Sequence, residues 1–182
     1  MRVLIDACVL YPTVMRQVVL GCAAAGLFEA RWSARIEEEW ARAAARLGAE
    51  AEVFARGEIA ALRATFPKAV IPPHPGLEKR LWLPDPNDIH VLAAAVAGSC
   101  DAILTVNAKD FPGNLLAEEG LFRADPDAFL RGLLEEATDD VTAVAKAVLA
   151  EANRLSDRTW EMRALMKKAR LPRLGKALAT LS

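Results

Sequence analysis

Short apolar runs alternate with longer stretches of helical periodicity over the first two thirds of this chain. The runs lie at Val3–Ile5, Phe28–Trp32, Ala69–Ile71, Ala102–Thr105 and Leu121–Arg123. Helical spacing fills the intervals over residues 13–27, 33–47, 50–66, 86–97 and 113–119, with a proline-rich turn at 72–76. Short buried strands separated by helices are typical of a doubly wound parallel sheet with right-handed crossovers. The pattern therefore predicts an α/β fold.

The last third of the chain has helical periodicity alone. Apolar positions recur at Leu130, Leu133 and Leu134, and again through residues 141–149 and 157–181. We therefore predict two parts, an α/β domain at residues 1–124 and an all-helical C-terminal extension at residues 125–182.

Composition limits the classes of function. The chain has 182 residues, 53% of them hydrophobic and 26% charged, with a net charge of −1. This balance predicts a globular protein without the overall basic character of many nucleic-acid-binding domains. Cys8, Cys22 and Cys100 lie too far apart for a zinc knuckle or a disulfide framework, and we expect free thiols. No run approaches the roughly 20 apolar residues of a membrane span, so we expect a cytoplasmic protein that binds no membrane.

Positive charge is concentrated locally between Arg154 and Lys176. This segment carries eight basic and two acidic residues, a local charge of +6. Such a segment suits several RNA phosphate contacts, for which Lys167, Lys168 and Arg170 are the candidates. The alternative is a solvated helix face, or a surface for an acidic protein partner.

Polar side chains follow two of the predicted strands. Asp6 comes directly after Val3–Ile5, while Thr105, Asn107 and Asp110 end or follow the strand that begins at Ala102. The carboxyl ends of parallel strands gather ligand-binding groups at one edge of the sheet. For Asn107 and Asp110 the alternative role is a turn or a cap of the next helix.

Two helix starts contribute further carboxylates. Ser33 is a plausible N-cap, and both Glu37 and Glu39 flank the apolar stripe of the helix that follows, so periodicity does not choose between them. Asp85 precedes Pro86 as a second N-cap signal, and Asp88 lies three residues later. The alternatives are solvated charges near a helix N-terminus for the glutamates, and a capping box for Asp88.

Carboxylates that converge on one point repel, and a shared divalent cation removes the conflict. Oxygen ligands without histidine or thiolate favour Mg²⁺ or Mn²⁺. Such ions catalyse phosphodiester hydrolysis, so the set predicts a metal-dependent nuclease. His74 and His90 have no base or nucleophile partner at a suggestive spacing.

The sequence resembles the PIN-domain ribonucleases, in particular VapC-type toxins of bacterial toxin–antitoxin pairs. The matching stretches occur in the family's order across residues 1–124 and are Leu4–Pro12, Trp32–Glu39, Asp85–Ala95 and Thr105–Pro112. The resemblance implies a parallel sheet of about five strands with helices on both faces. It also implies an endoribonuclease that leaves a 5′-phosphate, forms a homodimer and is inhibited by a cognate antitoxin. An RNA-maturation or decay nuclease, or a non-catalytic RNA-binding module, is the alternative.

The resemblance also assigns roles to individual residues. It implies four catalytic acids, Asp6, Glu39, Asp88 and Asp110, of which the three aspartates are the metal ligands, and it selects Glu39 over Glu37. Asp85, Thr105 and Asn107 form a secondary group, with Asn107 standing where many relatives have another aspartate. A further departure is Ala7-Cys8, where many PIN domains have a hydroxyl residue and then asparagine.

Overall fold

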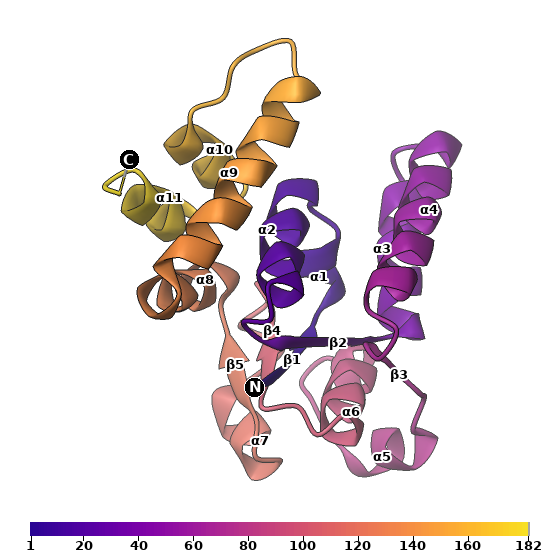
Figure 1. Cartoon of the computed structure of the whole chain (residues 1–182). Helices are drawn as coiled ribbons and strands as arrows, with labels where there is room; N and C mark the ends of the chain where they lie inside the picture. Colours follow the sequence, from indigo (N-terminus) through magenta and orange to yellow (C-terminus); the bar gives the residue numbers. More distant parts are fainter. Residues whose placement is uncertain (182) are drawn as a thin grey trace. The chain divides into compact units, whose positions relative to one another are not determined.

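A five-stranded parallel sheet organises the first part of the chain, and the computed structural model describes residues 1–181 (Figure 1). The strands lie in the order β3-β2-β1-β4-β5, and every neighbouring pair is parallel. Their bounds are β1 Arg2–Ile5, β2 Glu29–Ser33, β3 Val70–Ile71, β4 Ala102–Leu104 and β5 Phe122–Ala124. The predicted α/β fold is therefore confirmed.

The central strand β1 explains why the early apolar run is uninterrupted. Val3, Leu4 and Ile5 are fully buried because strands lie on either side and helices cover the sheet. Ile5 of β1 pairs with Leu104 of β4, so both strands end at the same level. The residues that follow, Asp6 and Thr105, consequently meet at the carboxyl edge.

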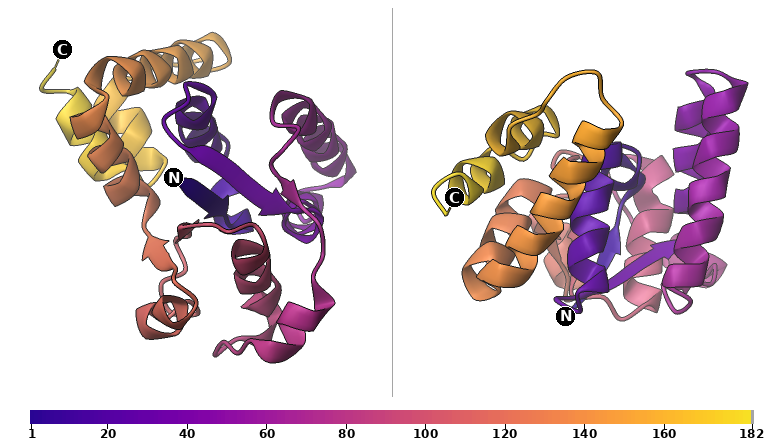
Figure 2. Two further views of the ribbon diagram at one scale, coloured as in Figure 1. Left: turned by 60° about the horizontal axis from the view of Figure 1, so that its bottom comes forward. Right: turned by 45° about the horizontal axis from the view of Figure 1, so that its top comes forward.

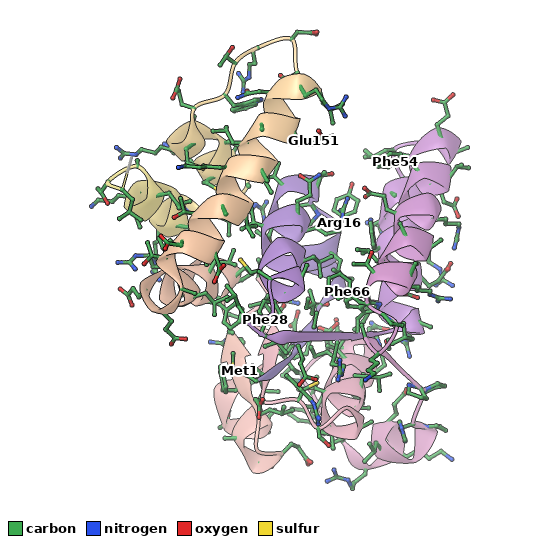
Figure 3. The ribbon with its side chains drawn as sticks, in the orientation of Figure 1. Met1, Arg16, Phe28, Phe54, Phe66 and Glu151 are labelled. Carbon is green, nitrogen blue, oxygen red and sulfur yellow. The ribbon has the colours of Figure 1, made fainter. Side chains whose placement is uncertain are left out.

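Helices lie on both sides of the sheet within this part. Helices α1 (Ala7–Leu10), α3 (Ala34–Ala45) and α4 (Ala49–Thr65) lie on one side of β2, and α6 (Ile89–Ala97) lies on the other (Figures 1 and 2). Phe66, at the end of α4, packs edge to face on Trp32 of β2 with ring centroids 5.8 Å apart (Figure 3). The remaining helices are α5 (Pro75–Arg80), the 3-10 helix η1 (Pro86–Asp88) and α7 (Gly113–Glu118).

Contacts divide the chain into two compact units. The first contains residues 1–11 and 29–124, and the second contains Pro12–Phe28 with the chain from Asp125 onward. Helix α2 (Thr13–Ala24) thus groups with the C-terminal helices, although it precedes most of the sheet in sequence. The sequence-based division at residue 124 places this helix in the α/β domain instead.

The second unit is all-helical and has its own core. Its C-terminal helices are α8 (Pro126–Glu136), α9 (Thr138–Arg154), α10 (Met162–Lys168) and α11 (Pro172–Leu178). Helices α2 and α9 approach closely, since a Cβ atom on Gly21 would lie 2.5 Å from Cγ1 of Val144. The buried Asp127 carboxylate of α8 accepts hydrogen bonds from the backbone amides of Arg173 and Leu174 in the first turn of α11.

Local structure differs from the sequence prediction in three places. A short helix, α1, follows β1 directly where no helix was predicted. The expected proline-rich turn leads into α5, because Pro75 suits the first position of a helix. The helix predicted at 86–97 begins as the 3-10 turn η1 before α6. In residues 1–181, no helix is both long and apolar enough to cross a membrane.

Candidate metal centre

Asp6 is held in place by residues from two neighbouring strand ends. It is 8% exposed and stands at the N-cap of α1, directly after β1. Its Oδ2 accepts a 2.7 Å hydrogen bond from the hydroxyl of Thr105 and a 3.0 Å hydrogen bond from the thiol of Cys8. These neutral donors stabilise the charged carboxylate and fix its direction.

Cys8 acts here as a hydrogen-bond donor. Burial, and then the charge and hydrogen bond of Asp6, raise the pKa of the Cys8 thiol to about 12. The side chain therefore stays protonated at neutral pH, and the ligands offered to a cation are oxygens. At the position where many PIN domains have asparagine, Cys8 thus provides a side chain that donates a hydrogen bond to Asp6.

The loop after β4 orients Asp110 through Asn107. The Asn107 amide nitrogen Nδ2 donates to Oδ2 of Asp110 at 2.6 Å, while its backbone N–H donates to the Thr105 hydroxyl at 3.0 Å. Arg123 of β5 holds the same loop, since its Nη1 donates at 2.8 Å to the carbonyl oxygens of Ala108 and of Phe111. The side chain of Asn107 thus orients the Asp110 carboxylate.

Asp85 and Asp88 enter the site from the turn η1. Asp85 is the N-cap and accepts from the backbone N–H of Asn87 at 2.9 Å. Asp88 makes no side-chain capping bond to α6, and its backbone amide binds the carbonyl oxygen of Asp85. The capping box is therefore absent here, and the Asp88 carboxylate is free to face the other acids.

The aspartates of this turn meet Asp110. One carboxylate oxygen from each of Asp85, Asp88 and Asp110 lies within 4.8 Å of the others. Burial, followed by the charges of Asp6, Asp85, Asp110 and Glu39, raises the pKa of Asp88 to about 6. Of the four predicted acids, the structure thus brings Asp88 and Asp110 together, and Asp6 and Glu39 affect Asp88 through their charge. The third member of the cluster is Asp85, which the sequence placed in the secondary group. A divalent cation would relieve the repulsion among these carboxylates.

Glu39 lies beside a histidine that sequence spacing did not reveal. Nε2 of His90 on α6 is 2.7 Å from Oε1 of Glu39 on α3, and the His90 side chain is only 3% exposed. Neither ring nitrogen of His90 has a partner in hydrogen-bond geometry within the described residues. No signal in the sequence links two helices 51 positions apart, so only the packing of α6 against the sheet could reveal this pair.

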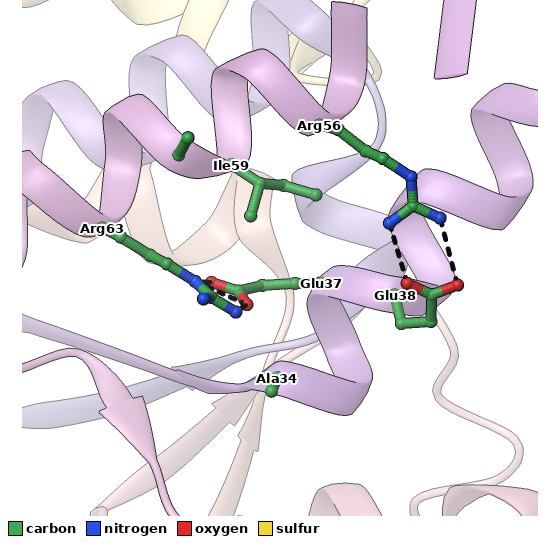
Figure 4. A pocket seen from close by; sticks show the side chains of 7 residues that line it. Ala34, Glu37, Glu38, Arg56, Ile59 and Arg63 are labelled. Carbon is green, nitrogen blue, oxygen red and sulfur yellow. Dashed lines mark hydrogen bonds and ion pairs between the residues drawn. The ribbon is translucent and has the colours of Figure 1, made fainter. Parts of the chain in front are cut away.

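Glu37 has a structural role instead. It is 4% exposed and accepts a 2.9 Å hydrogen bond from Nε1 of Trp32. Its other partner is Arg63 of α4, whose guanidinium is paired with the carboxylate (Figure 4). Helical periodicity could not separate these two glutamates, but their contacts differ. Glu37 joins α3 to α4 through its ion pair with Arg63, whereas the charge of Glu39 contributes to the raised pKa of Asp88.

The basic candidates belong to the second unit. Lys167, Lys168 and Arg170 are exposed at the end of α10, with Nζ of Lys168 4.9 Å from the Trp160 ring centre. Arg170 follows the helix with φ 62°, a left-handed conformation that costs energy for an ordinary side chain.

A comparison with protein families agrees with the fold. A family model described as a PIN domain matches residues 2–109. No curated protein and no solved structure gave a match.

Proposed function

Since this chain belongs to the PIN-domain family, whose members are typically metal-dependent nucleases, we propose that it is an endoribonuclease dependent on Mg²⁺ or Mn²⁺. The observation that carries the proposal is the cluster of Asp85, Asp88 and Asp110, whose carboxylate oxygens lie within 4.8 Å of one another. Carboxylates crowded at the partly exposed edge of the sheet repel one another without a hard cation, and such oxygen ligands favour Mg²⁺ or Mn²⁺. When bound at such a site, a divalent ion would activate water and neutralise charge on the phosphodiester.

The chain's own residues have distinct roles in this proposal. Asp6, Asp88 and Asp110 would hold the ion, Asp85 lies in the same cluster as Asp88 and Asp110, and Asn107 stands at the margin of the site. Thr105 and Cys8 orient Asp6 through hydrogen bonds to its Oδ2. Glu39 orients the water that attacks the phosphate, with His90 restricting its position. Hydrolysis in this manner leaves a 5′-phosphate and needs no 2′-hydroxyl nucleophile.

RNA binding and biological context are further parts of the proposal. Lys167, Lys168 and Arg170 contact RNA phosphates. The protein acts as the toxin of a toxin–antitoxin pair in the cytoplasm, as a homodimer held inactive by its antitoxin. Support comes from the VapC-like motifs and from the three free cysteines, which fit a reducing compartment.

Cleavage of an RNA pool tests the enzymatic part. Wild type should cut in Mg²⁺ or Mn²⁺ and be inactive in EDTA, and Asp6→Asn should lose at least about 10²-fold in rate. Asp139→Asn, an exposed carboxylate in the helical unit, is the matched control and should cut like wild type. Equal cleavage by wild type and Asp6→Asn rejects the site, and a 2′,3′-cyclic phosphate product rejects the mechanism.

Expression in cells tests the toxin role separately. The wild-type chain alone should arrest growth, and co-expression of a small protein encoded beside it should restore growth. A housekeeping RNA nuclease would cause neither effect.

A further inference from the structure

A pocket lies at the carboxyl ends of β2 and β3, where Ser33 and Ile71 contribute to its lining. Its volume is about 270 Å³, close to the lower end of small-molecule sites. The walls are apolar and come from Ile71, Pro72 and Pro73 after β3 and from Ala93 and Ala94 on α6. A volume of this size with apolar walls suits one ring system.

Polar side chains reach the pocket from several elements. They are Ser33 at the end of β2, Arg35 of α3, His74 before α5, Glu78 of α5 and the buried His90 of α6. The Arg35 guanidinium is 3.7 Å from the Glu78 carboxylate, longer than a hydrogen bond. Both groups therefore retain capacity for a ligand, one as a donor and the other as an acceptor. Nε2 of His90 lies against the Glu39 carboxylate, whereas its Nδ1 has no hydrogen-bond partner within the described residues.

Two side chains connect this pocket to the acidic cluster. Nε2 of His90 is 2.7 Å from Glu39, and Nε of Arg35 is 3.8 Å from the same carboxylate oxygen. Glu39 in turn acts on Asp88. In the sheet, β2 lies between β3 and β1. An RNA chain that crosses the carboxyl edge therefore passes from Asp6, after β1, to the pocket wall after β3 over two strand spacings, about 10 Å.

We propose that this pocket receives the base of a nucleotide next to the scissile phosphate and selects guanine. The proposal rests on the nuclease function above. Guanine offers N–H donors on its Watson–Crick edge to the Glu78 carboxylate, and acceptors O6 and N7 to the Arg35 guanidinium. Adenine, cytosine and uracil each lack part of this pattern, while the proline and alanine walls exclude water from the ring faces.

Direct binding tests the pocket without RNA cleavage. The four ribonucleoside 5′-monophosphates are titrated against the full chain in Mg²⁺ by calorimetry. Guanosine 5′-monophosphate should bind at least about tenfold more tightly than the other three. Ala94→Leu fills the pocket and should abolish binding, and Glu78→Gln should reduce the guanine preference about tenfold. Arg42→Ala removes an exposed arginine outside the pocket on the same helix as Arg35 and should bind like wild type.

Sequencing of the cut ends from a randomised RNA pool provides the second readout. Guanine should be enriched at one fixed position beside the cut, and Glu78→Gln, a change at a partly exposed side chain, should lose that enrichment even if Ala94→Leu fails to fold. Equal binding of all four monophosphates, or cleavage without guanine enrichment, overturns the pocket while the nuclease proposal stands. Selective binding by a protein that cuts no RNA supports the pocket and overturns the nuclease function.

Discussion

The hydroxyl of Thr105 donates a 2.7 Å hydrogen bond to Oδ2 of Asp6, joining residues 99 positions apart at the ends of adjacent parallel strands. Cys8 donates to the same oxygen, so the first acid of the site is fixed by two neutral donors. Groups that orient a metal ligand in this way commonly affect metal affinity nearly as much as the ligand itself.

Thr105→Val should therefore weaken the site without removing a ligand. The substitution keeps the shape of the side chain but removes the donor, and we expect metal affinity or cleavage rate to fall about 10- to 100-fold. Metal titration followed by calorimetry and the Mg²⁺ dependence of cleavage measure the effect. Thr65→Val, at an exposed hydroxyl in α4, is the control. Wild-type metal affinity in Thr105→Val would show that Asp6 needs no orientation.

The raised pKa of Asp88 predicts a pH-dependent stability of the metal-free protein. Because folding raises this pKa from 3.8 to about 6, protonation of Asp88 favours the folded state below about pH 4. That stabilisation is lost as the pH rises through 6. In EDTA, Asp88→Asn should therefore melt above wild type at pH 8 and like wild type below about pH 4.

Added Mg²⁺ provides the complementary measurement at this residue. The ion should raise the melting temperature of wild type at pH 8 more than that of Asp88→Asn. Its effect on wild type should shrink as the pH falls through 6, because protons then compete for Asp88. If the melting temperatures of wild type and Asp88→Asn differ by the same amount at every pH, the raised pKa of Asp88 is contradicted.

Glu37 and Glu39 should give opposite phenotypes. Glu37→Gln breaks the pair with Arg63 and should lower the free energy of unfolding by about 1–3 kcal/mol while cleavage is retained. Glu39→Gln should change stability by less than about 0.5 kcal/mol but reduce the cleavage rate at least about 10²-fold. Urea denaturation and single-turnover cleavage of both variants separate the roles. The reverse assignment would follow if Glu37→Gln alone lost activity.

Asp127 should control the stability of the helical unit. Its buried carboxylate accepts 2.9 Å hydrogen bonds from two amides at the start of α11, so Asp127→Ala leaves both without a partner. We expect a loss of about 1–2 kcal/mol in the free energy of unfolding and faster proteolysis of the C-terminal helices. Asp139→Ala, at an exposed position, should stay within about 0.5 kcal/mol of wild type. Unchanged proteolysis of Asp127→Ala would show that other contacts hold α11.

The basic segment predicts a salt-dependent affinity for RNA. Neutralising three cations as Lys167→Gln, Lys168→Gln and Arg170→Asn should weaken binding and reduce the log–log salt slope by about 2, or about 0.7 per phosphate contact. Asparagine is chosen at position 170 because it tolerates the left-handed backbone there. Arg46→Gln, Lys68→Gln and Lys146→Gln together form a control of equal charge at exposed positions. An unchanged slope in the test variant rejects the RNA-binding role.

The sequence by itself determined the fold class and the approximate position of the site. Periods of about 2 and 3.6 residues are local properties, and the fully buried run Val3–Ile5 requires strands on both sides. From this alone it followed that Asp6 and Thr105 lie at one edge of the sheet. The N-caps Ser33 and Asp85 were equally predictable, since a cap bonds to a backbone amide only two or three residues away.

Only the tertiary structure decided which carboxylates face one another. Glu37 and Glu39 are equivalent to helical periodicity, and Trp32 and Arg63 from other elements distinguish them. The contact of His90 with Glu39 and the grouping of α2 with the C-terminal helices likewise depend on packing between distant segments. The spacing of residues along the chain does not predict such contacts, because each of them forms only after the sheet and its helices have assembled.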